Sequence, residues 1–458
     1  MKIKIQMTIE NDSGETKMED IVTINRGELS IETVGLTLKE AKDVTANIQE
    51  LMTRHQFMEY IAKKRFCSCC GKIRCVKGYH SLTFRTVYGK LKIKSPRLNY
   101  CSCEGEARKS FSPLANLLTE RISPECLYLQ TKMASLMSYG VTAKLLEEVL
   151  PIQVNKSSLV NNCHKIASRL ENELDEERYS YIEGCPRDWG NLPKPNDKLT
   201  VGIDGGFIHA REDDNRKAGW FEVIVGKSLQ NNGPSKRFGF VTTYDTKPKR
   251  RLHNLLQKQG LQLNQSITFL SDGGDNVRDL QLFLSPEAEY ILDWFHVTMR
   301  ITVMKQIGKG LSEKVKTEIC EQLSRIKWYL WHGNVYMALT TIESLLFDLD
   351  DANAENLYNK LDEFNEYIRA NSPYIPNYAD RYHYGEYIST GFVESTVNEL
   401  VTRRMVKKQQ MRWTKKGAHF LLQNRVKTLN NELWDQFCQW YPEMAVAANN
   451  EIGLNEAA

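Results

Sequence analysis

The order of strand-like and helical segments after residue 198 constrains the fold of this chain most strongly. Three successive runs rich in β-branched and aromatic residues, LTVGIDGGFIHAR, WFEVIVGKSL and RFGFVTTYD, are separated by short turns and predict three strands. The amphipathic segment RLHNLLQKQG, strand-like SITFLSD, helical NVRDLQLFL and strand-like AEYILDWFH follow them. The sequence therefore predicts the order β-β-β-α-β-α-β.

This order is typical of an α/β ribonuclease-H-like core, in which the ends of the first and fourth strands lie side by side. The pattern between 297 and 387 is almost entirely helical, and further helices follow it. We therefore expect a ribonuclease-H-like catalytic core at 199–296 and 388–440, with an all-helical insertion at 297–387.

Acidic residues stand at the ends of the predicted first and fourth strands. Asp204 lies in VGIDGG and Asp272 in FLSDGG, and Glu394 lies on the helix after the insertion. Three converging carboxylates repel unless a cation is present, and hard oxygen ligands suit two Mg²⁺ or Mn²⁺ ions. Taken singly, each aspartate is as well explained as a helix cap or turn residue, and Glu394 as a solvated helix position.

A histidine follows the fifth predicted strand, in the motif DWFH. Asp293 and His296 are three residues apart, so they share a face if the helix has begun there. Such a histidine can hydrogen-bond a scissile phosphate or position a base. The alternative is that His296 only caps the helix.

Six of the eleven cysteines lie between residues 67 and 103. In a large chain this clustering favours a metal site over disulfides. Two knuckles joined by a hairpin-like stretch predict a zinc ribbon with four thiolate ligands: Cys67, Cys70, Cys101 and Cys103. The second knuckle, CSC, is one residue short of the common spacing, which leaves Cys69 and Cys75 as alternative ligands. The zinc would be structural.

Positive charge is concentrated in two segments. Residues 61–170 carry 19 Lys and Arg against 6 Asp and Glu, and residues 394–427 carry 9 against 2. Phosphate backbones are common partners of such segments, although a solvated basic face explains the charge equally well. The predicted DNA contacts are Arg85, Lys92, Lys94, Arg97, Arg403, Arg404, Lys407, Lys408, Arg412 and Trp413, the last stacking on an unpaired base.

The remaining segments complete the predicted organisation. Residues 127–174 predict three helices with a glycine-containing turn, typical of a helix-turn-helix, and ordinary helical packing gives the same pattern. The predicted parts outside the core are an α+β segment at 1–62, the zinc ribbon at 63–112, a helical DNA-binding domain at 113–182, a linker at 183–198 and a tail at 441–458.

Several motifs resemble those of a known family. IDGG, SDGGDNVR, DWFH and GFVESTVNELVTRRMVKKQQMRWTKKGAHFLLQNR, together with the cysteine segment CSCCGK and VYGKLKIKSPRLNYCSC, resemble bacterial insertion-sequence DDE transposases of the ISKra family, distant relatives of Mutator-type enzymes. The resemblance covers about residues 64–430. It implies that Asp204, Asp272 and Glu394 are the metal-binding triad and that Asp293 and His296 are the acid-x-x-His pair.

The resemblance implies an enzyme that binds the terminal inverted repeats of its mobile element and uses Mg²⁺ to cleave and transfer DNA strands. We expect double-stranded DNA ends and target DNA as partners, and a homo-oligomer as the active complex. Two alternatives remain: a DNA-binding regulator on a disused nuclease fold, and a junction-cutting nuclease. Without a long apolar run or secretory signal, we expect a cytoplasmic protein with no membrane partner.

Overall fold

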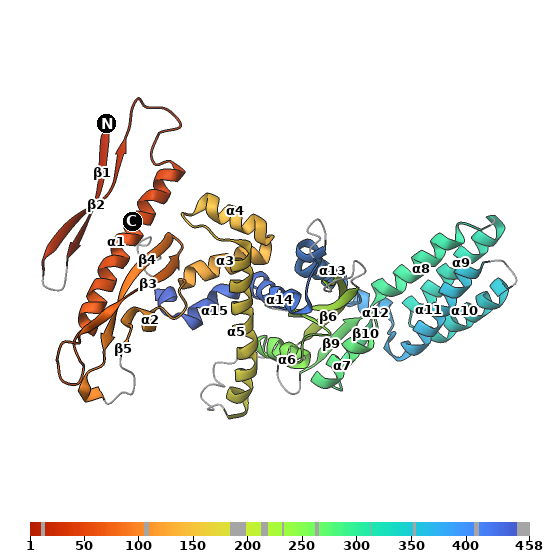
Figure 1. The fold of residues 1–458 in the computed structure, drawn as a ribbon. Helices are drawn as coiled ribbons and strands as arrows, with labels where there is room; N and C mark the ends of the chain where they lie inside the picture. Colours follow the sequence, from red (N-terminus) through yellow and green to blue (C-terminus); the bar gives the residue numbers. More distant parts are fainter. Residues whose placement is uncertain are drawn as a thin grey trace. The chain divides into compact units, whose positions relative to one another are not determined.

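The computed structural model comprises two compact units, Met1–Ile166 with Glu432–Ala458, and Ala167–Asn431 (Figure 1). Each unit is considered by itself. The structure describes residues 1–10, 14–104, 110–183, 198–211, 219–230, 233–261, 265–311, 313–350, 354–406 and 412–446. The predicted linker at 183–198 therefore lies almost wholly outside the described ranges. No described helix is both long enough and apolar enough to span a lipid bilayer.

The first unit begins with an antiparallel hairpin, β1 (Lys2–Glu10) and β2 (Thr16–Asn25), followed by α1 (Leu38–Lys64). Thr37 and Glu40 start α1 as a capping box, in which each side chain accepts a hydrogen bond from the other's backbone N–H. Asn47 on α1 donates a hydrogen bond to the Ile21 carbonyl of β2.

A three-stranded sheet follows α1. The long antiparallel hairpin of β3 (Val76–Thr86) and β4 (Gly89–Asn99) is extended by the short β5 (Ser110–Phe111). Leu82, Leu91 and Leu98 point inward from this hairpin and are buried. The alternation of buried and exposed residues along the hairpin matches the expectation for a ribbon with one covered face.

Helices make up the rest of the first unit: α2 (Pro113–Leu117), α3 (Pro124–Leu136), α4 (Tyr139–Val149), the start of α5 (Lys156–Glu183) and α15 (Leu433–Trp440). Asn155 caps α5, because its Oδ1 accepts a hydrogen bond from the Ser158 N–H at 2.7 Å. In α15, Trp434 and Phe437 pack edge-on against Tyr128 of α3. The second unit ends at Asn431, and α15 belongs to the first unit.

The second unit is a mixed α/β fold built on a five-stranded sheet. Its strands are β6 (Leu199–His209), β7 (Trp220–Gln230), β8 (Lys236–Val241), β9 (Ile267–Ser271) and β10 (Glu289–Leu292). They lie in the order β10-β9-β6-β7-β8. The β6, β7 and β8 strands are antiparallel neighbours, whereas β9 is parallel to β6 and β10 is parallel to β9.

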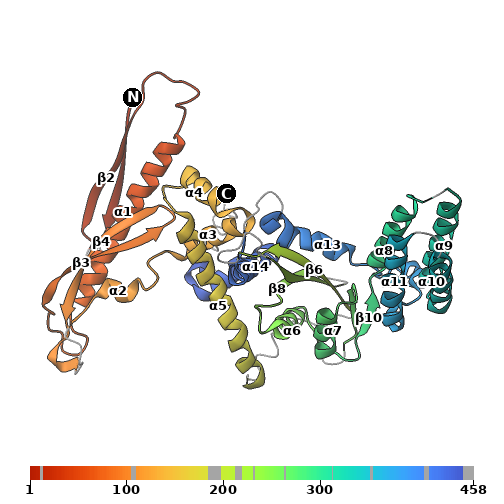
Figure 2. The same ribbon diagram turned by 45° about the vertical axis from the view of Figure 1, so that its right-hand side comes forward.

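Helices cover both faces of this sheet (Figure 2). On one face, α6 (Pro248–Lys258) and α7 (Asp275–Leu284) bury an apolar core that includes Val201, Ile203 and Phe269. On the other lie α13 (Gly391–Val397), a π-helical segment (Asn398–Val406) and α14 (Lys415–Leu429). The sheet is thus buried on both faces, which accounts for the near-continuous apolar runs of its parallel strands.

A helical block separates β10 from α13 in the chain. It contains α8 (Trp294–Gly308), α9 (Glu313–Trp331), α10 (Val335–Asp350), α11 (Glu355–Ala370) and α12 (Tyr378–His383). These helices share one apolar core, in which Leu323, Ile342 and Leu361 are buried. Tyr378 ties the block to the sheet by donating a hydrogen bond to the Leu292 carbonyl at 2.7 Å.

Candidate active site

Two of the predicted site residues lie opposite each other on adjacent parallel strands. The pairing of β6 with β9 runs as far as Gly202 opposite Leu270. Two residues further along both strands, Asp204 is therefore level with Asp272. Neighbouring strands are about 4.8 Å apart, so the fold places these two carboxylates side by side.

A third aspartate stands at the same edge of the sheet. The pairing of β9 with β10 ends with Ser271 opposite Leu292. Asp293 is the next residue, and its N–H donates to the Ser271 carbonyl at 2.9 Å. Asp272 and Asp293 therefore directly follow β9 and β10, and Asp204 lies within β6, two residues beyond its last parallel pairing with β9, while β6 continues to His209 along β7.

The Asp293 carboxylate is fully buried and holds surrounding groups in place. Its oxygens accept hydrogen bonds from the Phe295 N–H at 2.8 Å, the Thr390 N–H at 3.0 Å and the Thr390 hydroxyl. The Nδ1 atom of His296 lies 2.6 Å from Asp293 Oδ2. Each of the two carboxylate oxygens therefore already has two hydrogen-bond partners. Asp293 positions these groups and is not free to hold a metal ion.

His296 is held by Asp293 and lies close enough to Asp204 and Asp272 for their charges to act on it. With Nδ1 held by Asp293, its other ring nitrogen, Nε2, is left for a ligand. The Asp293 hydrogen bond raises the pKa of His296 against the opposing effect of burial, and the charges of Asp204 and Asp272 raise that pKa further. The pair Asp293 and His296 thus shares a face at the start of α8, as DWFH predicts.

Asp204 lies in a half-buried position that disfavours its charge. Burial raises the pKa of Asp204, and the nearby carboxylates of Asp272 and Asp293 raise it further, while a 2.7 Å hydrogen bond from the Gly205 N–H and the charge of His296 oppose them. A cation between Asp204 and Asp272 would relieve both the repulsion and the cost of burial.

Glycines on β6 bring the helix that carries Glu394 onto the same face of the sheet. A Cβ atom on Gly202 would lie 2.3 Å from the Val393 side chain, and one on Gly206 would lie 3.3 Å from that of Val397. By strand alternation, Asp204 faces α13 between these two contacts. Only a residue without a side chain fits at 202, which explains the glycine pattern around Asp204.

Glu394 itself is exposed on α13, next to the buried Val393. In the described parts of the chain, the carboxylates of Asp204, Asp272 and Glu394 do not all lie within 4.8 Å of one another. The fold thus pairs Asp204 with Asp272, and Glu394 lies on the helix above them without meeting both.

Two residues that the sequence reasoning missed lie beside Asp272. Tyr367 of α11 donates a hydrogen bond to the Asp272 carbonyl at 3.0 Å. The guanidinium of Arg300 stacks on the Tyr367 ring, 4.1 Å from its centre. Arg300 is one helical turn after His296, on the same face of α8, and no carboxylate within the described residues pairs with it. This places a cation near the acids.

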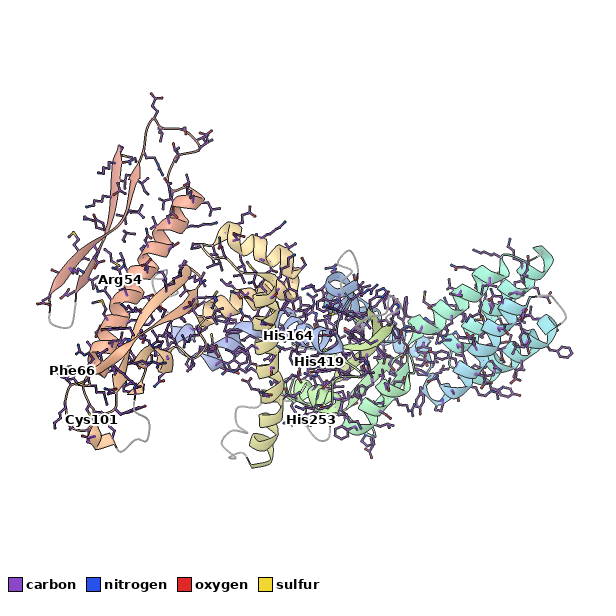
Figure 3. The ribbon with its side chains drawn as sticks, viewed as in Figure 1. Arg54, Phe66, Cys101, His164, His253 and His419 are labelled. Carbon is purple, nitrogen blue, oxygen red and sulfur yellow. The ribbon has the colours of Figure 1, made fainter. Side chains whose placement is uncertain are left out.

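The four cysteines predicted as zinc ligands converge in the first unit. Their sulfur atoms all lie within 4.8 Å of one another: Cys67 to Cys103 is 3.4 Å, and Cys70 is 3.5 Å from both Cys101 and Cys103. Tetrahedral zinc with Zn–S bonds of 2.3 Å requires sulfur separations of about 3.8 Å. The thiols therefore fit a four-thiolate zinc site, whose Cys101 is labelled in Figure 3.

The short second knuckle is accommodated by a tight turn. Residues Ser102–Glu104 form a 3₁₀ turn, and Glu104 accepts the Cys101 N–H at 2.7 Å. The buried Arg74 binds Glu104 and also donates to the Phe66 carbonyl. The backbone N–H of Cys103 and the neighbouring thiols lower the pKa of Cys101 to about 6, which favours the thiolate form that binds metal. Cys69 and Cys75 lie outside the cluster.

The basic residues predicted on the hairpin are exposed. Lys92 and Lys94 project from the outer face of β4, and Lys94 lies over the Tyr79 ring. Arg85 on β3 and Arg97 on β4 are also exposed. The hairpin therefore displays these four cations to solvent.

The predicted basic face near residues 403–413 is only partly exposed. Arg403 and Arg412 are exposed, whereas Arg404 and Trp413 are 1% and 5% exposed. Arg404 lies against the Trp413 ring, and the Trp413 backbone exchanges hydrogen bonds with the hairpin of β6 and β7. The expectation that Arg404 and Trp413 contact DNA is therefore corrected, since both are packing residues. Lys407 and Lys408 lie outside the described residues.

A second cluster with metal-ligand spacing joins Glu171, Asp245 and His419, the last labelled in Figure 3. Arg251 lies among them, 2.9 Å from both carboxylates, and it also donates to Gln423. The guanidinium already neutralises the acids, so this cluster is a buried ion-pair network that connects α5, α6 and α14.

This network predicts acid sensitivity. Burial alone would raise the pKa of Glu171, but His419 and Arg251 more than offset it and lower that pKa to about 2. Because the folded state favours the ionised carboxylate of Glu171, this carboxylate stabilises the fold above about pH 4.5. The stabilisation is lost as the pH falls from there toward 2. We expect Glu171→Gln to reduce the free energy of unfolding at pH 7 by about 3 kcal/mol.

The difference between wild type and Glu171→Gln should fall by about half between pH 4.5 and pH 3 and approach zero near pH 2, as measured by urea unfolding across a pH series. Glu173→Gln, two residues along α5, serves as the matched control and should have little effect, because its partner Arg169 is a more exposed neighbour on the same helix. A pH-independent difference would contradict the assigned ion pair.

Comparison with known proteins gives no family assignment. No family model matches the chain, and no curated protein matches it. Among solved structures, the Drosophila P element transposase strand transfer complex aligns at 9% identity over 69% of this chain and 80% of that one, with a TM-score of 0.23. NurA aligns at 12% identity over 61% and 65%, with a TM-score of 0.12. Such low scores carry no argument, so the resemblance to ISKra transposases depends on the motifs quoted above.

Proposed function

We propose that this chain is a DDE transposase that cleaves and transfers DNA strands at an acidic metal site. The observation that carries the proposal is the parallel register of β6 and β9, which brings Asp204 level with Asp272 just after the end of β9, together with the His296–Asp293 hydrogen bond at the start of α8. The strand order β10-β9-β6-β7-β8, with three antiparallel strands followed by two parallel ones, supports a ribonuclease-H-like core.

Divalent ions are the proposed cofactors, because the donor set consists of carboxylate oxygens. Asp204 and Asp272 would hold Mg²⁺ or Mn²⁺, and Glu394 on α13 would complete the set. When bound, two such ions supply an activated water or 3′-hydroxyl and stabilise the leaving oxygen of an in-line phosphoryl transfer. The half-buried position of Asp204 supports this assignment, because burial and the neighbouring carboxylates raise its pKa despite the opposing charge of His296, and a bound cation would favour the ionised carboxylate.

The neighbouring residues would act on the DNA phosphate. His296, fixed by Asp293, presents Nε2 as a hydrogen-bond donor to a non-bridging oxygen. Arg300, stacked on Tyr367, would contact the same or the adjacent phosphate with its planar guanidinium. Tyr367 also donates a hydrogen bond to the Asp272 carbonyl, so it positions both the Arg300 guanidinium and Asp272.

We expect Arg300→Ala to slow DNA cleavage about 10- to 100-fold, since a hydrogen bond to a charged group contributes about 1.5–3 kcal/mol. Arg300→Lys should recover part of the loss, because it keeps the charge but not the fork geometry. The measurement is single-turnover cleavage at saturating DNA and metal. Lys305→Ala, further along α8 and bonded to Ser324, is the matched control and should cleave normally. Equal losses in both variants would indicate a general effect on α8.

Binding of the element ends is assigned to the first unit. Its thiolate cluster fixes the β3–β4 hairpin, which carries the exposed Arg85, Lys92, Lys94 and Arg97. Arg403 and Arg412 would contact phosphates near the active site. The helices α3, α4 and α5 are proposed as a helix-turn-helix-like reader of the terminal repeats.

A strand-joining assay tests the proposal and separates it from its rivals. Purified protein would be given duplexes from the DNA flanking its gene, with one end pre-cut to expose a 3′-hydroxyl, together with a supercoiled target plasmid and Mg²⁺. A transposase joins the end to the plasmid. A junction-cutting nuclease would cleave without joining, and a regulator on a disused fold would bind the end and do neither.

A further inference from the structure

The outer edge of β1 is open. The strand is nine residues long, and among the described residues β2 is its only partner in the sheet. Its odd-numbered residues from Ile3 to Ile9 form an apolar face, while the even-numbered ones are polar and exposed. Long open edges are templates for pairing with another strand.

The backbone groups of β1 point alternately toward β2 and toward this open edge. Met1 and Arg26 exchange two hydrogen bonds, which makes them a hydrogen-bonded pair. Because such pairs alternate, the odd-numbered residues of β1 bond to β2 and the even-numbered residues turn their N–H and C=O groups outward. The extra residue at the bulge, Ile21, is on β2, so the alternation along β1 is unbroken.

We propose that β1 pairs antiparallel with β1 of a second copy of this chain, with Gln6 on the twofold axis. In this register Lys4 lies opposite the partner's Thr8, and Lys2 lies opposite the partner's Glu10. In this register the even-numbered residues of the two strands, whose N–H and C=O groups point toward the open edge, lie opposite one another. The two strands can therefore form backbone hydrogen bonds directly. Neither Lys2 nor Glu10 has an ion-pair partner within the described residues, and the twofold axis brings their opposite charges together twice.

The apolar face is also self-complementary in this register. Ile3 lies beside the partner's Ile9, and Ile5 beside the partner's Met7. Ile3 and Ile5 line a largely apolar cavity of about 420 Å³ between the hairpin and the segment that leads to α1. Pairing would extend that face across a four-stranded sheet and cover Ile3, which is 39% exposed. The proposal is independent of the catalytic chemistry assigned to the second unit.

The oligomeric state of the DNA-free full-length protein tests the proposal. We expect sedimentation velocity to show a reversible monomer–dimer equilibrium in the micromolar range. Thr8→Pro removes an outward N–H that β2 does not use, so the hairpin should survive while the dimer dissociation constant rises about 10-fold or more. A wild-type protein that stays monomeric, or a Thr8→Pro dimer of unchanged affinity with unchanged circular dichroism, would overturn the proposal.

Charge reversal tests the register without changing the backbone. Glu10→Lys should weaken the dimer by placing like charges together, and the double variant Lys2→Glu with Glu10→Lys should restore it. A double variant weaker than the single one would exclude this pairing.

Crosslinking locates the axis. In the proposed register, two Gln6→Cys residues face each other about 5.5 Å apart at Cα, within disulfide range. Mild oxidation should give a peptide that joins position 6 to position 6, identified by mass spectrometry. Thr8→Cys is the matched control, because the two copies of residue 8 would be about 14 Å apart. Crosslinking of both variants alike, or of neither in a dimeric protein, would contradict the register.

Discussion

The Asp204→Asn variant is expected to bind DNA ends with wild-type affinity and to cut them at least about 1,000-fold more slowly. The amide has the volume of the carboxylate and can still accept the Gly205 N–H through its oxygen, so β6 and α13 should pack as before. It removes the charge that would hold a divalent ion, and the loss of several kcal/mol of charge stabilisation corresponds to about this factor. The prediction requires single-turnover nicking assays and, separately, DNA-binding measurements by fluorescence anisotropy.

Asp272→Asn should behave in the same way, because the two residues are equivalent across the β6–β9 pair. Isothermal titration with Mn²⁺ should show weakened metal binding in both variants, which ties the loss of cutting to the ion. Asp279→Asn, an exposed residue on α7, is the control and should cut normally. Wild-type nicking by Asp204→Asn would remove Asp204 from the mechanism, while a loss of DNA binding would indicate misfolding.

Much of the second unit was predictable from the order and periodicity of the sequence. The strand-like runs around Asp204 and Asp272 form β6 and β9, and alternating helices and strands give a mixed α/β fold, as expected. The parallel register of β6 and β9 brings Asp204 level with Asp272, although β6 continues past Asp204 to His209. The proximity of Asp204 and Asp272 follows from this geometry alone.

For the basic segment after Glu394, the α-helical periodicity of the sequence does not predict which side chains are exposed. Both Arg403 and Arg404 are predicted to contact DNA, which requires both side chains to reach the surface of their helix. The segment Asn398–Val406 is a π-helix instead, in which each N–H bonds five residues back. That change rotates each side chain relative to the α-helical expectation. Arg404 thereby enters the interior beside Trp413, while Arg403 stays exposed.

Tyr367 and Arg300, which the sequence did not predict as site residues, are placed there by contacts between distant segments. Tyr367 reaches the Asp272 carbonyl from 95 residues further along the chain, and it also fixes Arg300 on a different helix. Nothing in the local pattern around Arg300 separates it from other cations on α8. Its place became evident only when the packing of α8 against α11 was known.

The second large effect is expected at the thiolate cluster. Cys67→Ser should lower the zinc content of the purified protein from one ion per chain to near zero and unfold the β3–β4 hairpin. Structural zinc contributes about 10–16 kcal/mol of apparent binding free energy in small domains, far more than the few buried leucines of this hairpin provide. Zinc content is measured by atomic emission, and local unfolding by hydrogen exchange of residues 76–99.

Cys69→Ser is the decisive control for this prediction. Cys69 lies next to Cys70 in the sequence but outside the group of four sulfurs, and it is exposed. Its serine variant should retain one zinc ion and wild-type hydrogen exchange. If Cys69→Ser loses zinc as Cys67→Ser does, the ligand set must be reassigned; if neither loses it, zinc does not bind here. Because Arg74 links the cluster to the end of α1 through the Lys64 carbonyl, the loss of zinc in Cys67→Ser should also increase exchange at the last turn of α1.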